Sequence, residues 1–265
     1  MDMKLLRSTI FIALFFVHTF SLSFPQQFTQ KQVALFKENA ELGVGSEQYN
    51  LAFAYQHGHG ITKDSNKAKY WYSEAAKSPH ANIRYKVGRL FETGQLFPQD
   101  FKKAIEHYTY AANKADPFAQ NNLALMYLYG KGVEKDIDKA IVWFETAAES
   151  AVVNAYVNLA VIYQQNKNTH DKSIYWWTKA AEEDYPDAYF QLGQFYYWQK
   201  NYQEAFNFFK KGAEINHTDA QLKLAMFYYK GIGTDKNHEQ SLMWLNKAAK
   251  SGNEKAIAML KNIAN

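Results

Sequence analysis

The chain repeats one short pattern along most of its length. A pair of small residues, Ala75-Ala76 in its first copy, recurs in steps of 36, 36, 33, 32 and 36 residues, up to Ala248-Ala249. A second marker is aliphatic, begins at Leu51 and moves in steps of 36, 36, 36, 33, 32 and 36 residues to Leu260. Two markers with matched spacing indicate a tandem repeat, in which each unit buries its apolar face only against its neighbours.

Each unit is predicted to contain two helices and no strand. In the first helix, a small residue usually lies four positions before the aliphatic marker and an aromatic residue four positions after it, as in Ala119, Leu123 and Tyr127. Spacing by fours places all three on one helical stripe. In the second helix, apolar residues fall at i, i+3, i+4, i+7 and i+8, which is typical of a helix with one wide buried face. The three or four residues missing from the fourth and fifth units fall between the two markers, so we expect that difference in a loop.

Capping and turn residues predict where the helices begin and end. Before every second helix stands a side chain whose oxygen can accept a hydrogen bond from a free backbone N–H. These predicted caps are Asp64, Asp100, Asp136, Thr169, Asn201 and Asn237. Pro117 and Pro186 open first helices, where proline breaks no helical hydrogen bond. Glycine pairs that begin at Gly58, Gly130 and Gly231 are expected to end first helices, because glycine permits the left-handed conformation.

Residues 1–23 are predicted to form a secretory signal peptide. Lys4 and Arg7 precede an apolar run, and Ser21 and Ser23 supply the small residues that precede a cleavage point. The run is shorter than the roughly 20 apolar residues that span a bilayer. The alternative is an uncleaved anchor helix.

The remaining chain is divided into two parts. Residues 24–45 are predicted to form an N-terminal capping helix and linker, which Thr29 and Gln32 open with a capping box. Residues 46–265 are predicted to form the repeat region.

The repeat resembles a known family. The pattern is fullest in residues 119–148, at Ala119, Leu123, Tyr127, Gly130, Gly132, Val133, Asp136, Lys139, Ala140, Trp143, Phe144, Ala147 and Ala148. This unit is similar to the Sel1-like repeat family, whose members are relatives of the tetratricopeptide repeat, and the resemblance covers roughly residues 46–262. The fourth and fifth units lack both glycines, so their turns look more like tetratricopeptide turns. The resemblance implies an all-α fold, a right-handed α–α superhelix of about six helix-pair repeats with a capping helix at each end.

Composition excludes several kinds of site. The chain has no cysteine, which excludes disulfides, thiolate zinc sites and cysteine nucleophiles. With 30 Lys and Arg against 26 Asp and Glu, a nucleic-acid binder held mainly by charge is not expected.

Stacked helix pairs are expected to form a curved rod with a concave groove, and the resemblance implies that the first helices line this groove. Positions two before, two after and five after the aliphatic marker lie opposite the buried stripe, and many of them are aromatic or aliphatic. Such a face suits a peptide, since aromatic rings supply contact area while amides and Arg reach backbone groups. The predicted partner-binding residues are Tyr49, Phe53, Tyr85, Arg89, Asn121, Leu125, Phe190, Gln194, Tyr197, Met226 and Tyr229. The alternative is that these residues pack against the next helix pair.

No catalytic residue, cofactor or metal site is predicted. His57 and His59 with Asp64 could bind zinc, but the neighbouring glycines already explain this turn and the next units have no counterpart. His107 occupies the position of a repeat tryptophan and is expected in the core. Asn216-His217-Thr218 is a glycosylation sequon that matters only in a eukaryote.

These observations predict an exported, non-catalytic scaffold that binds a protein or peptide partner through the groove. The alternative is a regulator or inhibitor of a cell-envelope enzyme, and an enzyme is the weakest candidate. The location is expected to be periplasmic or extracellular in a bacterium and the secretory-pathway lumen in a eukaryote. We expect no nucleic-acid partner and no stable membrane insertion after signal removal. The oligomeric state stays open.

Overall fold

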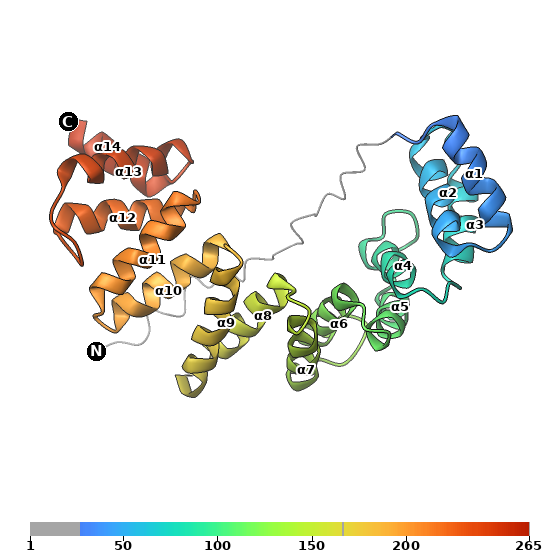
Figure 1. Ribbon diagram of the computed structural model, residues 1–265, viewed down its shortest axis with the longest axis horizontal. Coiled ribbons are helices and arrows are strands. Elements are labelled where there is room, and N and C mark those ends of the chain that lie inside the picture. The colour runs from blue at the N-terminus through green and yellow to red at the C-terminus, as the bar shows by residue number, and fades with distance from the viewer. Residues whose placement is uncertain (1–26, 166, 265) are drawn as a thin grey trace. The chain divides into compact units, whose positions relative to one another are not determined.

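The computed structural model describes residues 27–165 and 167–264 of the chain (Figure 1). Within these residues the structure is helical and contains no strand. The described residues divide into two compact units, one that ends at residue 99 and one that begins at residue 100. The predicted signal peptide, residues 1–23, lies outside the described residues. Among the helices of the described part, none combines the length and the apolar character needed to cross a bilayer.

Between residues 27 and 99, the first unit contains four helices. They are α1 (Gln30–Glu41), α2 (Gly45–His57), α3 (Ser65–Ala75) and α4 (Ala81–Thr93). Helix α1 lies within residues 24–45, the predicted N-terminal capping helix and linker, and its capping box is confirmed. The backbone N–H of Thr29 donates to Gln32 Oε1 at 2.8 Å, and the N–H of Gln32 donates to Thr29 Oγ1 at 3.2 Å.

In its described part, residues 100–165 and 167–264, the second unit contains ten α-helices and one short 3-10 turn, Lys167–Thr169. The α-helices are α5 (Phe101–Asn113), α6 (Pro117–Tyr129), α7 (Ile137–Ala148), α8 (Val153–Gln164), α9 (His170–Glu182), α10 (Pro186–Trp198), α11 (Tyr202–Glu214), α12 (Thr218–Lys230), α13 (His238–Lys250) and α14 (Glu254–Ala264). From α2 to α13, even-numbered helices are the first helices of the repeats and odd-numbered ones the second. The prediction of an all-α fold made of helix-pair repeats is confirmed.

The core is built from the repeated small and apolar positions. The alanines four positions before the marker, such as Ala119 and Ala155, are fully buried, and so is Ala147 of the small-residue pairs. Tyr108 and Phe144 of the second helices fill the space beside them. His107 is buried as well, which confirms its assignment to the core. Small residues at helix contacts allow the close approach that such stacking requires.

Five of the six predicted caps are confirmed. Asp64, Asp100, Asp136, Asn201 and Asn237 each accept hydrogen bonds from backbone N–H groups in the first turn of the following helix. The prediction for Thr169 is wrong, because its side chain makes no capping bond to α9. Its hydroxyl donates to the carbonyl oxygen of Tyr163 at 2.6 Å instead. The physical reason is the shortened loop, whose 3-10 turn ends at Thr169 and directs the hydroxyl back to α8.

The two glycines of each glycine pair have different functions. The first, as at Gly130, ends its helix in the left-handed conformation with φ 66°. The second lies against the start of an earlier second helix: a Cβ on Gly132 would come within 2.7 Å of the carbonyl carbon of Phe101, the first residue of α5. Gly60 approaches Thr29 at the start of α1, and Gly233 approaches Tyr202 at the start of α11, in the same way. These turns therefore hold successive repeats together.

Candidate partner-binding face of the first helices

Side chains on one side of the first helices of the second unit are open to solvent. On α6, Phe118 is 56% exposed and Tyr129 is 49% exposed, with the half-buried Leu125 between them. On α8, Val161 is 41% exposed, and on α10, Trp198 is 75% exposed. Phe118 lies five positions before the aliphatic marker of its helix, Leu125 and Val161 lie two positions after it, and Tyr129 and Trp198 lie six positions after it. The position one before the marker falls on the same side of the helix. We call this set of positions on α6, α8 and α10 the exposed stripe.

A chain of side-chain amides connects the exposed stripe to the core. Asn158 of α8 donates to Asn121 Oδ1 at 3.4 Å, and Asn121 donates to Asn122 Oδ1 at 3.3 Å. Asn122 in turn donates to the hydroxyl of Tyr108 at 3.3 Å. Asn121 is only 6% exposed, so this predicted partner-binding residue bonds within the protein and joins α6 to α8. Asn158 is half-buried and lies on the exposed stripe itself.

The four predicted residues of the first unit are all half-buried. Tyr49 packs edge-on against Tyr72 with ring centroids 5.0 Å apart, and burial raises the pKa of its hydroxyl to about 12. The cation of Lys86 lies 5.2 Å from the Tyr49 ring centroid. Phe53 contacts the rings of Phe28, His57 and His59. Tyr85 and Arg89 lie on α4.

The remaining predicted residues of the second unit differ in exposure. Tyr197 and Tyr229 are 37% and 58% exposed, and Tyr229 lies edge-on to His238 at 5.5 Å. Leu125, Phe190, Gln194 and Met226 are half-buried. Phe190 stacks on His217 with centroids 4.9 Å apart, and Met226 packs against the core around α12. Some predicted residues therefore also pack between repeats, as the alternative interpretation expected.

His217 connects α12 to helix α10 of the preceding repeat. Its Nδ1 accepts a hydrogen bond from the N–H of Ala220 and so caps α12, while its Nε2 lies 2.9 Å from Asp187 Oδ1. The same ring stacks on Phe190. Three contacts from one side chain fix the spacing of α10 and α12.

The most exposed apolar members of the stripe, Phe118, Tyr129 and Trp198, are not among the predicted partner-binding residues. They lie five positions before or six positions after the marker, to one side of the face directly opposite it. The spacing of four, three and four residues from Phe118 through Asn122 and Leu125 to Tyr129 was the signal that could have found them.

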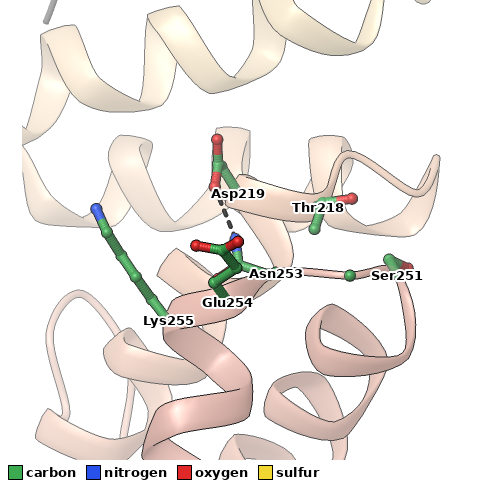
Figure 2. Close-up of a pocket in the computed structure, with 7 residues that line it drawn as sticks. Thr218, Asp219, Ser251, Asn253, Glu254 and Lys255 are labelled. Atoms are coloured by element: carbon green, nitrogen blue, oxygen red, sulfur yellow. Dashed lines mark hydrogen bonds between the residues drawn. The ribbon is translucent and has the colours of Figure 1, made fainter.

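A shallow pocket lies between the starts of α12 and α14 (Figure 2). Asn253 donates to Asp219 Oδ1 at 2.8 Å across it, and the Asn253 side chain also accepts from the N–H of Ala256 as the cap of α14. In Figure 2 Asn253 points toward Asp219, and the carboxylates of Asp219 and Glu254 lie close to the helix starts. The carboxylates of Asp219 and Glu254 already complement the partial positive charge at the N-termini of α12 and α14. We therefore interpret this pocket as a contact between repeats.

The histidine turn does not assemble a metal site. The rings of His57 and His59 lie 5.7 Å apart, beside Phe53. Within the described residues, no group of three or more histidine or acidic side chains is placed to hold a metal ion.

The comparisons with known proteins identify the family. A Sel1 repeat model matches residues 48–80, 84–116, 117–152, 153–185 and 218–253, and a tetratricopeptide repeat model matches residues 186–219. Since the Sel1 matches cover more than half of the chain, the protein belongs to the Sel1 repeat family. The fifth unit matches the tetratricopeptide model as its short turn suggested, whereas the fourth still matches the Sel1 model. Members of this family are generally non-catalytic scaffolds that mediate protein interactions.

Two solved structures illustrate the similarity. One is a protective antigen present in uropathogenic Escherichia coli strains, described as displaying an SLR fold, with 30% identity, a TM-score of 0.79, and coverage of 84% of this chain and 50% of that one. The other is a Sel1 repeat protein from Oxalobacter formigenes, with 27% identity, a TM-score of 0.55, and coverage of 88% and 80%. The chain thus spans about half the length of the antigen. A comparison with curated protein sequences finds no match.

Proposed function

We propose that the protein is an exported, non-catalytic scaffold that binds a protein partner on the exposed face of its first helices. The observation that carries this proposal is the row of exposed apolar side chains on successive first helices, from Phe118 and Tyr129 through Val161 to Trp198. Surface apolar residues scattered singly are ordinary, but a repeated row on one side of adjacent helices is typical of an interaction surface. Family membership supports a protein as the partner.

Export rests on the predicted signal at residues 1–23, and regulation of a cell-envelope enzyme remains the narrower alternative. Both forms of the proposal use the same face. They differ in whether the captured partner is an enzyme whose turnover changes on binding.

A pair of double variants tests the proposed function. Val161→Ser with Trp198→Ser removes two exposed apolar side chains from the first helices. Val142→Ser with Tyr175→Ser removes a matched valine and aromatic residue, 60% and 54% exposed, from the second helices α7 and α9. Each tagged protein is incubated with an extract of the source cells, and captured proteins are quantified by mass spectrometry.

We expect partners captured by the parent to be lost from the first-helix variant and kept by the second-helix variant. Circular dichroism melting of both variants checks that each is folded. Loss confined to the second-helix variant would move the binding surface to the other side of the repeats.

A further inference from the structure

The first helices of the second unit are almost free of charge over three successive repeats. Helix α6 and helix α8 contain no Asp, Glu, Lys or Arg. Helix α10 contains one such residue, Asp187, and its carboxylate is bonded to His217 at 2.9 Å. The second helices between them are ordinary charged surface helices. Helix α9, for example, carries Asp171, Lys172, Lys179 and Glu182.

On α6 and α8 the exposed stripe therefore offers only aromatic, aliphatic and amide groups, and on α10 its one charged member is Asp187, whose carboxylate is bonded to His217. The apolar members of the stripe include Phe118, Tyr129, Val161 and Trp198. Its amide members include Asn154 at the start of α8 and the half-buried Gln194 on α10. Side-chain amides both donate and accept hydrogen bonds, which matches the alternating groups of a peptide main chain.

Lysine residues flank this stretch. Lys131, in the turn after α6, lies over the rings of Phe101 and Tyr129 at 5.5 and 5.9 Å. On the other side, α12 carries Lys223 and Lys230. The uncharged stretch is therefore three first helices wide.

A charged partner segment is poorly matched to this surface. Burying a carboxylate or ammonium group there removes its hydration, and the one charged side chain on the stripe, Asp187, is already bonded to His217. An uncharged segment loses nothing of this kind, and its apolar side chains gain contact with the exposed rings.

We propose that the segment bound across α6, α8 and α10 is an uncharged, apolar stretch of polypeptide, recognised without ion pairs. This inference rests on the proposed function and narrows the chemistry of the partner. Helices packed about 10 Å apart place the outer two of three about 20 Å from each other. An extended chain rises about 3.3 Å per residue, so a segment of about six to nine residues covers the stretch.

Three fluorescein-labelled nine-residue peptide pools test the inference. All have Leu, Phe, Val or Tyr at alternate positions, and the positions between them are Ser, Asn and Gln in one pool, Asp and Glu in the second, and Lys and Arg in the third. Binding to the full chain is measured by fluorescence anisotropy at low and high NaCl. We expect the uncharged pool to bind at least about tenfold more tightly than either charged pool, with affinity that changes less than about twofold with salt, because little counterion release accompanies uncharged contacts.

Charge placed on the stripe supplies the matched control. Val161→Lys and Val161→Glu are both expected to weaken binding of the uncharged pool, whereas Val142→Lys and Val142→Glu on α7 are expected to leave it unchanged. Circular dichroism melting of each variant separates a binding defect from misfolding. Val161→Ser is the uncharged substitution at the same position.

Preference for a charged pool, equal binding of all three pools, or no binding of any pool would overturn the inference. Tighter binding of a neutral oligosaccharide such as cellohexaose would also overturn it. If the Val161→Ser, Trp198→Ser double variant still loses the captured partner in those cases, the proposed function stands and only the partner chemistry is wrong. If that double variant keeps the partner, the proposed function itself is wrong.

Discussion

Single residues in the turns between repeats carry backbone strain that the repeat pattern does not reveal. Ala115 and Ala151 have φ values of 61° and 55°, and Asp184 and Asn216 occupy the same place in the next two turns. Gly43 and Gly252 take this position at the two ends of the repeat region. Non-glycine residues pay a steric penalty of about 1–2 kcal/mol in this conformation.

Ala115→Gly is therefore expected to stabilise the second unit by about 0.5–1 kcal/mol, since relief of the left-handed strain exceeds the added entropy of glycine. Thermal melting checks the change. Ala148→Gly, in the last turn of α7, is the control and should lower the melting temperature. A melting temperature for Ala115→Gly below that of the parent would show that the strain is absent.

The surroundings of His57 are expected to make the stability of the first unit depend on pH. Burial, and then the neighbouring His59 and Lys63, lower the pKa of His57 below its ordinary value of 6.5. The unfolded chain therefore takes up a proton at higher pH than the folded chain does. The contribution of His57 to the stability of the first unit is therefore fully present above about pH 6.5, and it is lost as the pH falls toward the lowered pKa.

His57→Gln should remove this contribution. Melting temperatures of parent and variant are compared at about pH 7.5 and about pH 5.5, and the parent should lose more stability between them. Equal losses in the two proteins would show that His57 does not couple folding to protonation in this range.

At the scale of helices, the sequence predicted the elements well and the surface poorly. Periodic positions such as Ala119 and Leu123 are buried because their spacing alone puts them on the packed side of α6. Exposure at the edges of that stripe depends on which neighbour covers each position, so the burial of Asn121 did not follow from spacing. Thr169 failed as a cap because a shortened loop changes the path of the chain before α9.

The second glycine of each pair should tolerate substitution less well than a glycine that has only left-handed geometry. Gly252 has φ 86° with no atom within 4 Å of an added Cβ, whereas Gly132 has φ 72° and an added Cβ would meet the Phe101 backbone at 2.7 Å. Gly252→Ala is expected to cost about 1 kcal/mol, from conformation alone. Gly132→Ala should cost clearly more, because α5 or the turn must shift. Equal losses in urea melts would mean that this contact does not hold the repeats together.

A substitution at Ala147 tests the packing of α7 against the neighbouring helices. Ala147 is fully buried between apolar neighbours, and Ala147→Leu inserts three extra carbon atoms into that contact. We expect a loss of about 1–3 kcal/mol from overpacking. The exposed Val142→Leu on the same helix is the control and should be near neutral, and a melting temperature of Ala147→Leu equal to that of the parent would contradict the packing.

At the scale of the whole molecule, the repeats are alike in sequence while the structure forms two units. The turn after α4 has Leu96 where other glycine turns have their second glycine. Leu96 and Phe97 pack against the core of the first unit, so this turn belongs to the helices before it. The missing glycine was visible in the sequence, but its consequence depends on the core it packs into.

Site-specific photo-cross-linking tests the central claim, that the first helices present the binding surface, most directly. Benzoylphenylalanine replaces Val161 on α8 in one protein and Val142 on α7 in the other, two valines that are 41% and 60% exposed. Illumination in the source cells should link a partner to position 161 and none to position 142. A partner linked at position 142 and absent at position 161 would contradict the account.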